Sequence, residues 1–254
     1  MQYCLHMNAF SDTLKTWRKT RRLSQLDLAL EADVSSRHIS FLETGRAQPS
    51  REMVARLGDA LQLPAGTRNQ MLSQAGFAPQ YTQRDWDDAA MTPVRAALDY
   101  TLDRHTPYPG IALDKLWTVE RMNAPAKTLF GGLQIAEGDS LLDLMMSDTL
   151  PQLIENWAEV AHHAAQRLRT ESAAQGGVPA LDRAARHLAA IPQTQNQPLG
   201  PVAPTIYRMG GTRLSLFATI SQFGTPEDLA LHDLKIELYF PADDATRQAF
   251  EAMG

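Results

Sequence analysis

The residues best suited to chemistry lie within positions 24–46, and their types are those of a surface that contacts DNA. Arg37 carries a forked guanidinium that pairs with guanine, or with phosphate if its register differs. Ser36 and Ser40 can donate hydrogen bonds to base edges or accept them. Gln25 lies in the first turn of a leading helix, whose N-terminal N–H groups also attract phosphate. These side chains predict a nucleic-acid interface.

Two short helices joined by a turn are needed to present these residues. Ser24 is a good N-cap for the first helix, and Asp33 occupies the turn because Asp tolerates left-handed backbone. Ser35 is a good N-cap for the second helix, whose Ile39 and Leu42 are expected to point inward. The first helix is expected to bury one apolar stripe, which comprises Leu26, Leu28, Ala29 and Leu30.

The charged residues around the two helices refine this interface. Arg46 follows the glycine that ends the second helix, and it joins the predicted DNA contacts. Glu43 is expected to pair with a nearby Arg or to cap within the domain, because it would repel phosphate. A basic flank precedes the motif and is expected to add phosphate attraction; it comprises Arg18, Lys19, Arg21 and Arg22.

Three alternatives stay open at this point. His38 is better explained as a solvated or phosphate-facing residue than as a reader of bases. Phe41 covers the core or touches a thymine methyl. The whole segment could instead be a plain helical hairpin with a solvated polar face, although caps, turn, spacing and basic flank together favour DNA binding.

Residues 10–76 resemble the Xre-type family of phage-repressor-like regulators. The matching segments occur in order: Leu23-Ser24-Gln25, Leu28-Ala29, Val34-Ser35, Ile39-Ser40, Leu42-Glu43-Thr44-Gly45-Arg46 and Pro49-Ser50. The resemblance implies an all-α, lambda-repressor-like head in which Gln25 and Ser35 anchor phosphates while Ser36, Arg37 and Ser40 read sequence. Asp33 stands where that family usually has Gly. A homodimer is expected, since one recognition helix contacts few base pairs.

The element order changes after residue 92. The patterns predict a helix over 93–104, strands over 108–114 and 116–123, and a series of helices over 124–130, 140–147, 150–174 and 178–190. After a proline-rich loop over 193–204, strands are expected over 204–209, 212–223 and 234–240, with a closing helix over 243–253. Two strands, several helices and three strands is the order of a PAS-like sensor domain.

Residues 93–253 also resemble the ligand-binding domain of MmyB-like regulators. The resemblance rests on Tyr108-Pro109, Trp117, Asn123-Ala124 and Leu129-Phe130-Gly131. It implies capture of a small apolar molecule, with a fatty-acid-like ligand as the leading idea.

Bulky side chains on the expected strands and helices are candidates to enclose such a ligand. They are Trp117, Met122, Phe130, Met145, Trp157, Tyr207 and Phe217, with Leu144, Leu216 and Phe223 as further candidates. Each of them is individually better explained as core filling. Arg121, Arg208 and Arg213 could hold a carboxylate, but a position on a strand edge is favoured for each.

Charge and composition agree with a DNA-binding head on an acidic body. The net charge is −5 over 254 residues, yet residues 1–80 hold ten Lys and Arg against seven Asp and Glu. The single cysteine, Cys4, excludes an intrachain disulfide and fits a cytoplasmic protein. No signal peptide or membrane span is expected. Met7 begins a stretch typical of such heads, so residues 1–6 are expected to be a mis-set start or a disordered tail.

Enzyme signatures are lacking in the sequence. There is no glycine-rich phosphate loop and no Gly-x-Ser-x-Gly elbow, so no catalytic residue and no cofactor is predicted. Glu159 and His163 have a spacing that a metal could use, but a solvated helix face is favoured and no metal is predicted.

These patterns together predict a multidomain chain. It has a helix-turn-helix DNA-binding domain over 8–77, a linker over 78–92 and an α+β PAS-like ligand-binding domain over 93–254. The predicted function is sequence-specific transcription regulation, with double-stranded DNA and a small apolar ligand as partners. The rival hypothesis makes the second domain a dimerisation or partner-docking module without a ligand.

Overall fold

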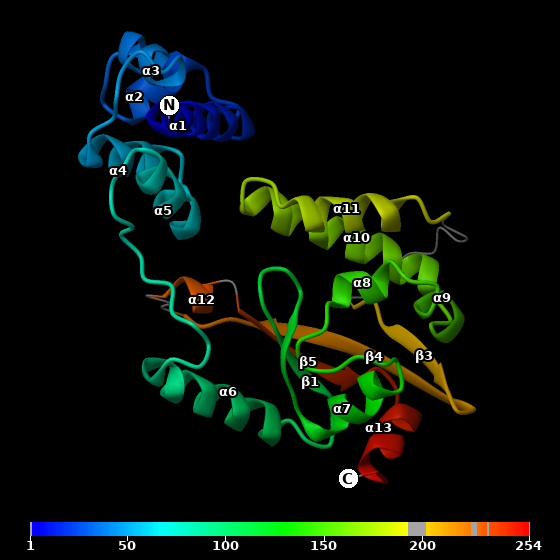
Figure 1. Cartoon of the computed structure of the whole chain (residues 1–254). Coiled ribbons are helices and arrows are strands. Elements are labelled where there is room, and N and C mark those ends of the chain that lie inside the picture. Colours follow the sequence, from blue (N-terminus) through cyan, green and yellow to red (C-terminus); the bar gives the residue numbers. More distant parts are fainter. Residues whose placement is uncertain (1, 193–201, 225–227, 233, 254) are drawn as a thin grey trace. The chain divides into compact units, whose positions relative to one another are not determined.

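The chain folds into two compact units (Figure 1). The computed structural model describes residues 2–192, 202–224, 228–232 and 234–253, with side chains from residue 9 onwards. The first unit, called the helical unit here, contains five helices in its N-terminal part: α1 (Gln2–Thr20), α2 (Gln25–Glu31), α3 (Ser36–Glu43), α4 (Arg51–Ala60) and α5 (Ala65–Gln74). Residues 2–6 continue α1, so the predicted disordered tail is wrong for them.

Local sequence signals fix the ends of α2 and α3. Ser24 and Asp27 form a reciprocal capping box at the start of α2. Asp33 adopts a left-handed backbone with φ 51°, as its place in the turn predicts. The Ser35 hydroxyl accepts a hydrogen bond from the His38 N–H at the start of α3. The predicted helix-turn-helix is therefore confirmed.

The core of the helical unit corrects one prediction about α2. Leu28 and Ala29 are buried there, but Leu26 is 59% exposed and Leu30 is 73% exposed. Leucines at every second position alternate around a helix, since successive residues turn by about 100°. Leu26 and Leu30 lie four residues apart, so they share the outer face. The buried face packs with α1, α3, α4 and α5 through Phe10, Leu14, Trp17, Ile39, Leu42, Val54, Leu57 and Met71.

The second unit, called the sheet unit here, is built around five antiparallel strands in the order β2-β1-β5-β4-β3. The strands are β1 (Gly110–Leu113), β2 (Val119–Met122), β3 (Thr205–Met209), β4 (Thr212–Ser221) and β5 (Lys235–Pro241). A Gly210-Gly211 turn with positive φ at both residues joins β3 to β4. This α+β architecture confirms the predicted fold class.

The remaining helices belong largely to the sheet unit. They are η1 (Ala89–Met91), α6 (Thr92–Arg104), α7 (Ala124–Gly131), α8 (Leu141–Met145), α9 (Leu150–Leu153), α10 (Trp157–Ala174), α11 (Pro179–Ala189), α12 (Leu229–His232) and α13 (Asp244–Glu251). Ile236 and Leu238 of β5 pack with Leu98 and Leu102 of α6. Lys235 and Glu237, which alternate with them, contact α10 instead. Figure 1 shows α6 and α10 on opposite sides of the sheet.

The helix predicted over 150–174 is interrupted, which the sequence pattern did not indicate. The Glu155 N–H donates to the Ile206 carbonyl, and the Asn156 Oδ1 accepts from the Ile206 N–H. These bonds satisfy part of the open edge of β3, so the chain leaves the helix at Ile154 and resumes it at Trp157. The predicted helix is therefore two helices, α9 and α10.

The short helix α12 was not predicted. The proline-rich loop expected over 193–204 lies mostly outside the described residues. None of the helices in the described ranges has the length and apolar character that a membrane crossing would need.

Candidate DNA-binding surface and ligand cavity

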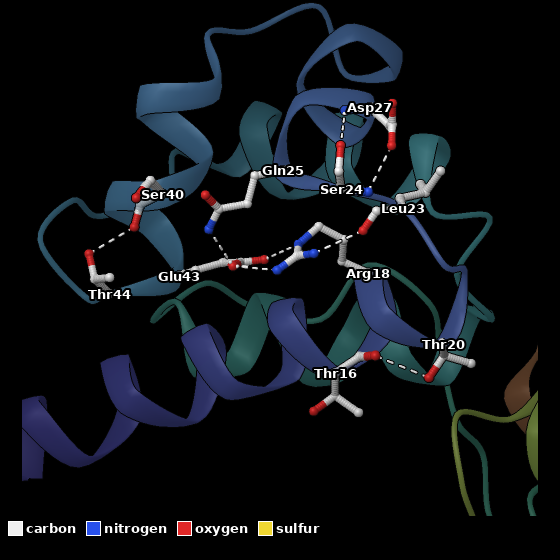
Figure 2. Close-up of polar contacts among 10 residues, drawn as sticks. All are labelled: Thr16, Arg18, Thr20, Leu23, Ser24, Gln25, Asp27, Ser40, Glu43 and Thr44. Carbon is white, nitrogen blue, oxygen red and sulfur yellow. Dashed lines mark hydrogen bonds and ion pairs between the residues drawn. The ribbon is translucent and has the colours of Figure 1, made fainter.

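A buried ion pair holds the helix-turn-helix together (Figure 2). Arg18 of α1 donates from Nε to Glu43 Oε1 at 2.6 Å and from Nη2 to Glu43 Oε2 at 2.9 Å. Its Nη1 donates to the Leu23 carbonyl at 2.8 Å, next to the start of α2. Gln25 Nε2 donates to Glu43 Oε2 at 2.8 Å. One carboxylate at the end of α3 thereby joins three helices, which confirms the expectation that Glu43 pairs with a nearby Arg.

Glu43 is ionised in this setting. Burial by itself raises the pKa of Glu43, but hydrogen bonds from Arg18 and Gln25, with the Arg18 charge, outweigh it and hold the pKa below its ordinary value. The hydrogen bonds to Glu43 in turn raise the pKa of Arg18. The pair is charge-balanced, and the Glu43 side chain is only 2% exposed.

Two residues of the predicted basic flank form hydrogen bonds within the helical unit. The Arg18 side chain is 12% exposed and bonded to Glu43. Arg21 donates to the carbonyls of Leu61 and Gln62 at 2.9 and 3.0 Å, where it closes the end of α4. Arg22 is exposed, with a left-handed φ of 58°.

The residues predicted to contact DNA gather on α2, α3 and the turns beside them. Ser35, Ser36, Arg37 and Arg46 are exposed, while Gln25 and Ser40 are half-buried. The Arg37 guanidinium carbon lies 5.2 Å from the centroid of the Phe41 ring, one turn further along α3. Phe41 is half-buried, and its ring lies beside the Arg37 guanidinium.

The sheet unit contains a cavity of about 440 Å³ between the sheet and helices α8 to α10. Its lining is mainly apolar: it comprises Trp117, Phe130, Leu133, Leu141, Leu144, Met145, Leu150, Ile154, Trp157, Val160, Ala164, Ala203, Thr205, Tyr207, Leu216, Phe217, Ala218 and Tyr239, with the ionisable residues Glu159, His163, Arg167 and Glu237. This volume falls within the range of small-molecule pockets.

Six of the seven predicted ligand-enclosing residues lie in this lining. The exception is Met122, which is buried beside β1 and is not part of the lining. The ring of Phe217 stacks on that of Phe240 with centroids 5.7 Å apart, so it also fills space between strands. Of the further candidates, Leu144 and Leu216 line the cavity, whereas Phe223 packs near α6.

Trp117, a residue of the cavity lining, has an unusual backbone conformation. Its φ of 65° is rare for a bulky residue and indicates strain that the surroundings must offset. Its indole Nε1 donates to Glu171 Oε2 at 2.8 Å. Arg167 and Lys235 place their charges over its ring, 4.3 and 4.8 Å from the centroid.

A network of four charged residues adjoins the cavity beside Trp117. Arg167 Nε donates to Glu171 Oε1 at 2.8 Å, and its Nη2 lies 2.6 Å from Glu237 Oε1. Lys235 Nζ donates to Glu171 Oε2 at 2.6 Å. Tyr239 donates its hydroxyl to Glu237 Oε2 at 3.2 Å.

Burial and pairing act in opposite directions on these charged groups. Burial favours a higher pKa for Glu171, but the hydrogen bond and charge of Lys235 outweigh it and lower the pKa. For Arg167, burial lowers the pKa, and the charges of Glu237 and Glu171 more than offset it. Burial lowers the pKa of Lys235, and burial next to Glu237 raises that of Tyr239. The four charges therefore balance one another as two cations and two carboxylates.

The arginines considered for a ligand carboxylate lie elsewhere. Arg208 and Arg213 both pair with Glu155 outside the cavity lining. Arg121 lies between Asp99 and Glu137, with N···O distances of 3.7 and 3.9 Å. Arg121 and Arg208 lie on the edge strands β2 and β3, as favoured, whereas Arg213 lies on β4, between β3 and β5.

Arg167 and Glu237 are two charged residues of the cavity lining that sequence reasoning missed. A signal was available in β5, where Lys235, Glu237 and Tyr239 alternate with apolar residues on one face of a buried strand. Within the described ranges, no three His, Cys, Asp or Glu side chains gather as metal ligands. A solvated helix face was favoured for Glu159 and His163. Both residues line the cavity, while the neighbouring His162 hydrogen-bonds Gln166, so that prediction is only partly correct.

Comparison with known families agrees with this arrangement. Residues 94–253 match the MmyB-like transcription regulator ligand binding domain, and this match covers more than half of the chain. The chain belongs to that family. Residues 9–71 match a helix-turn-helix domain. No curated protein matches the chain. The protein is thus a DNA-binding transcription regulator with a ligand-binding domain.

Proposed function

We propose that this regulator changes its affinity for an operator when its sheet unit binds a small, largely apolar, fatty-acid-like molecule, that is, an apolar chain with one polar end. The observation that carries the proposal is the 440 Å³ cavity, whose lining is mostly apolar with a few polar groups. This composition is typical of small-molecule sites, in which apolar area supplies affinity and a few polar groups set orientation.

The coupling between the two functions is thermodynamic. A ligand shifts DNA affinity only by its differential affinity for two arrangements of the chain, and DNA binding then changes ligand affinity by the same factor. The domain limits that fit this division are 8–77 for DNA binding, 78–92 for a linker and 93–254 for ligand binding. The family matches over 9–71 and 94–253 support these limits.

In the helical unit, α3 is the proposed recognition helix. Ser36, Arg37 and Ser40 would read base edges, while Gln25 and Ser35 would anchor phosphates at the starts of α2 and α3. The Gln25 amide nitrogen has two protons, and its bond to Glu43 uses one of them. The exposed Arg22 and Arg46 would add phosphate contacts at the edges of the surface.

We infer that the protein binds DNA as a homodimer and has no catalytic activity. Symmetric half-sites would double the few base pairs that one α3 helix can contact. The absence of catalysis is supported by the two matching families, which are regulator and helix-turn-helix domains.

Native mass spectrometry of the freshly purified protein tests this proposal, followed by denaturing extraction. A small apolar molecule that travels with a dimer, and is released only on unfolding, is the expected result. The matched control is a variant in which Ala164→Phe fills part of the lining; its dimer should carry less of the same molecule. A ligand-free wild-type chain that also shows no response to added amphiphiles would favour the docking-module hypothesis.

A further inference from the structure

The charged residues beside the cavity balance one another except for one carboxylate. Arg167 pairs with Glu171 and Glu237, at N···O distances of 2.8 and 2.6 Å. Lys235 pairs with Glu171 at 2.6 Å, so these two cations and two carboxylates cancel. Glu159, the other acidic residue of the lining, has no cation as a partner among the described residues. The uncompensated charge of the cavity is therefore negative and belongs to Glu159.

The Glu159 carboxylate is accessible rather than sealed in the core. Glu159 lies in the first turn of α10 and is half-buried. Asn156 Nδ2 donates to its Oε2 at 3.2 Å, whereas its Oε1 accepts no hydrogen bond from the part of the chain that the structure describes. That oxygen keeps contact with solvent, in contrast to the fully covered Trp157 Nε1. Glu159 Oε1 is therefore free to accept a hydrogen bond from a ligand.

The lining offers no unpaired cation to an anionic head group within the described ranges. The N-terminus of α10 favours negative charge, but Glu159 already places a carboxylate in that first turn. With His163 neutral, Arg167 is the one cation of the described lining, and it is held by Glu237. A ligand that displaced Glu237, whose side chain is 5% exposed, would leave a buried charge without a partner. An anion therefore meets repulsion in the cavity.

A cationic head group meets two favourable features instead. Glu159 supplies a counter-charge and an acceptor oxygen, and hydrogen bonds between charged groups are the strong ones. Aromatic rings also attract cations to their faces. Such rings in the lining belong to Trp117, Phe130, Trp157, Tyr207, Phe217 and Tyr239. Trp117 already has two cations over its ring, 4.3 and 4.8 Å from the centroid.

We propose that the cavity binds an apolar chain whose polar end is a protonated amine, and that Glu159 selects this amine over a carboxylate on the same chain. This inference rests on the proposed ligand-sensing function and names the head group of its ligand. The ammonium donates to Glu159, and the apolar chain contacts the apolar part of the lining. The Arg167–Glu237 pair stays intact when such a ligand binds.

Isothermal titration of the full chain at neutral pH tests this selection with probes of equal chain length: protonated decylamine, decanoate and the uncharged decanol. Decylamine should bind about tenfold more tightly than decanoate or better, because Glu159 attracts the first and repels the second. Equal or tighter binding of decanoate would overturn the inference and leave the ligand-sensing function standing. Binding of decanol without decylamine would do the same. If none of the probes binds, both the inference and the ligand-sensing function fail.

Two variants show whether Glu159 causes the selection. Glu159→Gln should weaken decylamine binding about tenfold and strengthen decanoate binding, because the amide carries no charge. Decanol affinity should stay at the wild-type value in this variant, which shows that the cavity is intact. Glu155→Gln is the control, since this carboxylate pairs with Arg208 and Arg213 outside the lining and should alter none of the affinities. An unchanged ratio of decylamine to decanoate affinity in Glu159→Gln would refute the assignment.

Discussion

Replacing Glu43 by Gln tests whether the buried ion pair holds the helical unit together. The carboxylate accepts two hydrogen bonds from Arg18 and one from Gln25, and its side chain is 2% exposed. An amide of the same shape keeps one acceptor oxygen but leaves Arg18 without a counter-charge. Breaking a buried pair in this way costs about 3–5 kcal/mol. Because Arg18 keeps 12% of its side chain in contact with water, we expect a loss near the lower limit, about 3 kcal/mol.

Amide hydrogen exchange of the full chain, followed on peptides from α2 and α3, measures this loss locally. The double variant Arg18→Met/Glu43→Leu removes both charges and should return the free energy of opening to within about 1 kcal/mol of the wild type. Asp59→Asn is the control: it removes the partner of Arg68 in the same unit, but Asp59 is 73% exposed, so the change should stay below about 1 kcal/mol. The reasoning is refuted if Glu43→Gln matches the wild type, or if the double variant is as unstable as the single one.

Three further predictions address acidity, packing and DNA contact. Because the pKa of Glu43 lies below its ordinary 4.5, the folded helical unit binds fewer protons than the unfolded chain near that pH. The free energy of unfolding should therefore fall as the pH drops through and below 4.5. Urea titrations at several pH values should show that this free energy depends less on pH in Glu43→Gln than in the wild type. Leu28→Ala should lower the free energy of unfolding by about 2–5 kcal/mol in thermal unfolding, because Leu28 is fully buried. Leu30→Ala should change it by less than about 0.5 kcal/mol, because Leu30 is exposed. Equal losses would contradict the assigned buried face of α2. Arg37→Ala should weaken operator binding by about 1–3 kcal/mol in fluorescence anisotropy if Arg37 reads a base, and an unchanged affinity would remove it from the interface.

The features of the helical unit that could be predicted from sequence are local ones. Ser24, Asp33 and Ser35 act on backbone within three residues of themselves, so their roles follow from residue type and position. The position of Leu26 and Leu30 on the exposed side of α2 was not predictable in the same way. It depends on which side of a two-turn helix meets the neighbouring helices, and three alternating leucines do not indicate that side.

The sheet unit shows why partner-dependent features escaped prediction. The break in the helix at Ile154–Asn156 exists because β3, about fifty residues later in the chain, offers an open edge there. The pairing of Arg167 with Glu237 joins α10 to β5 across about seventy residues of the chain. Aromatic residues such as Trp117 and Trp157 could be predicted as lining because large apolar side chains gather inside any such domain. The charged residues of the lining, such as Arg167 and Glu237, could not be predicted in this way, because their pairing depends on tertiary contacts.

The affinity of the full chain for its operator, measured with and without a saturating bound ligand, tests the central claim most directly. We predict a difference of about 5–150-fold, with ligand affinity changing by the same factor when operator DNA is present. Equal operator affinities in the two states would contradict the claim that the sheet unit regulates DNA binding through its ligand.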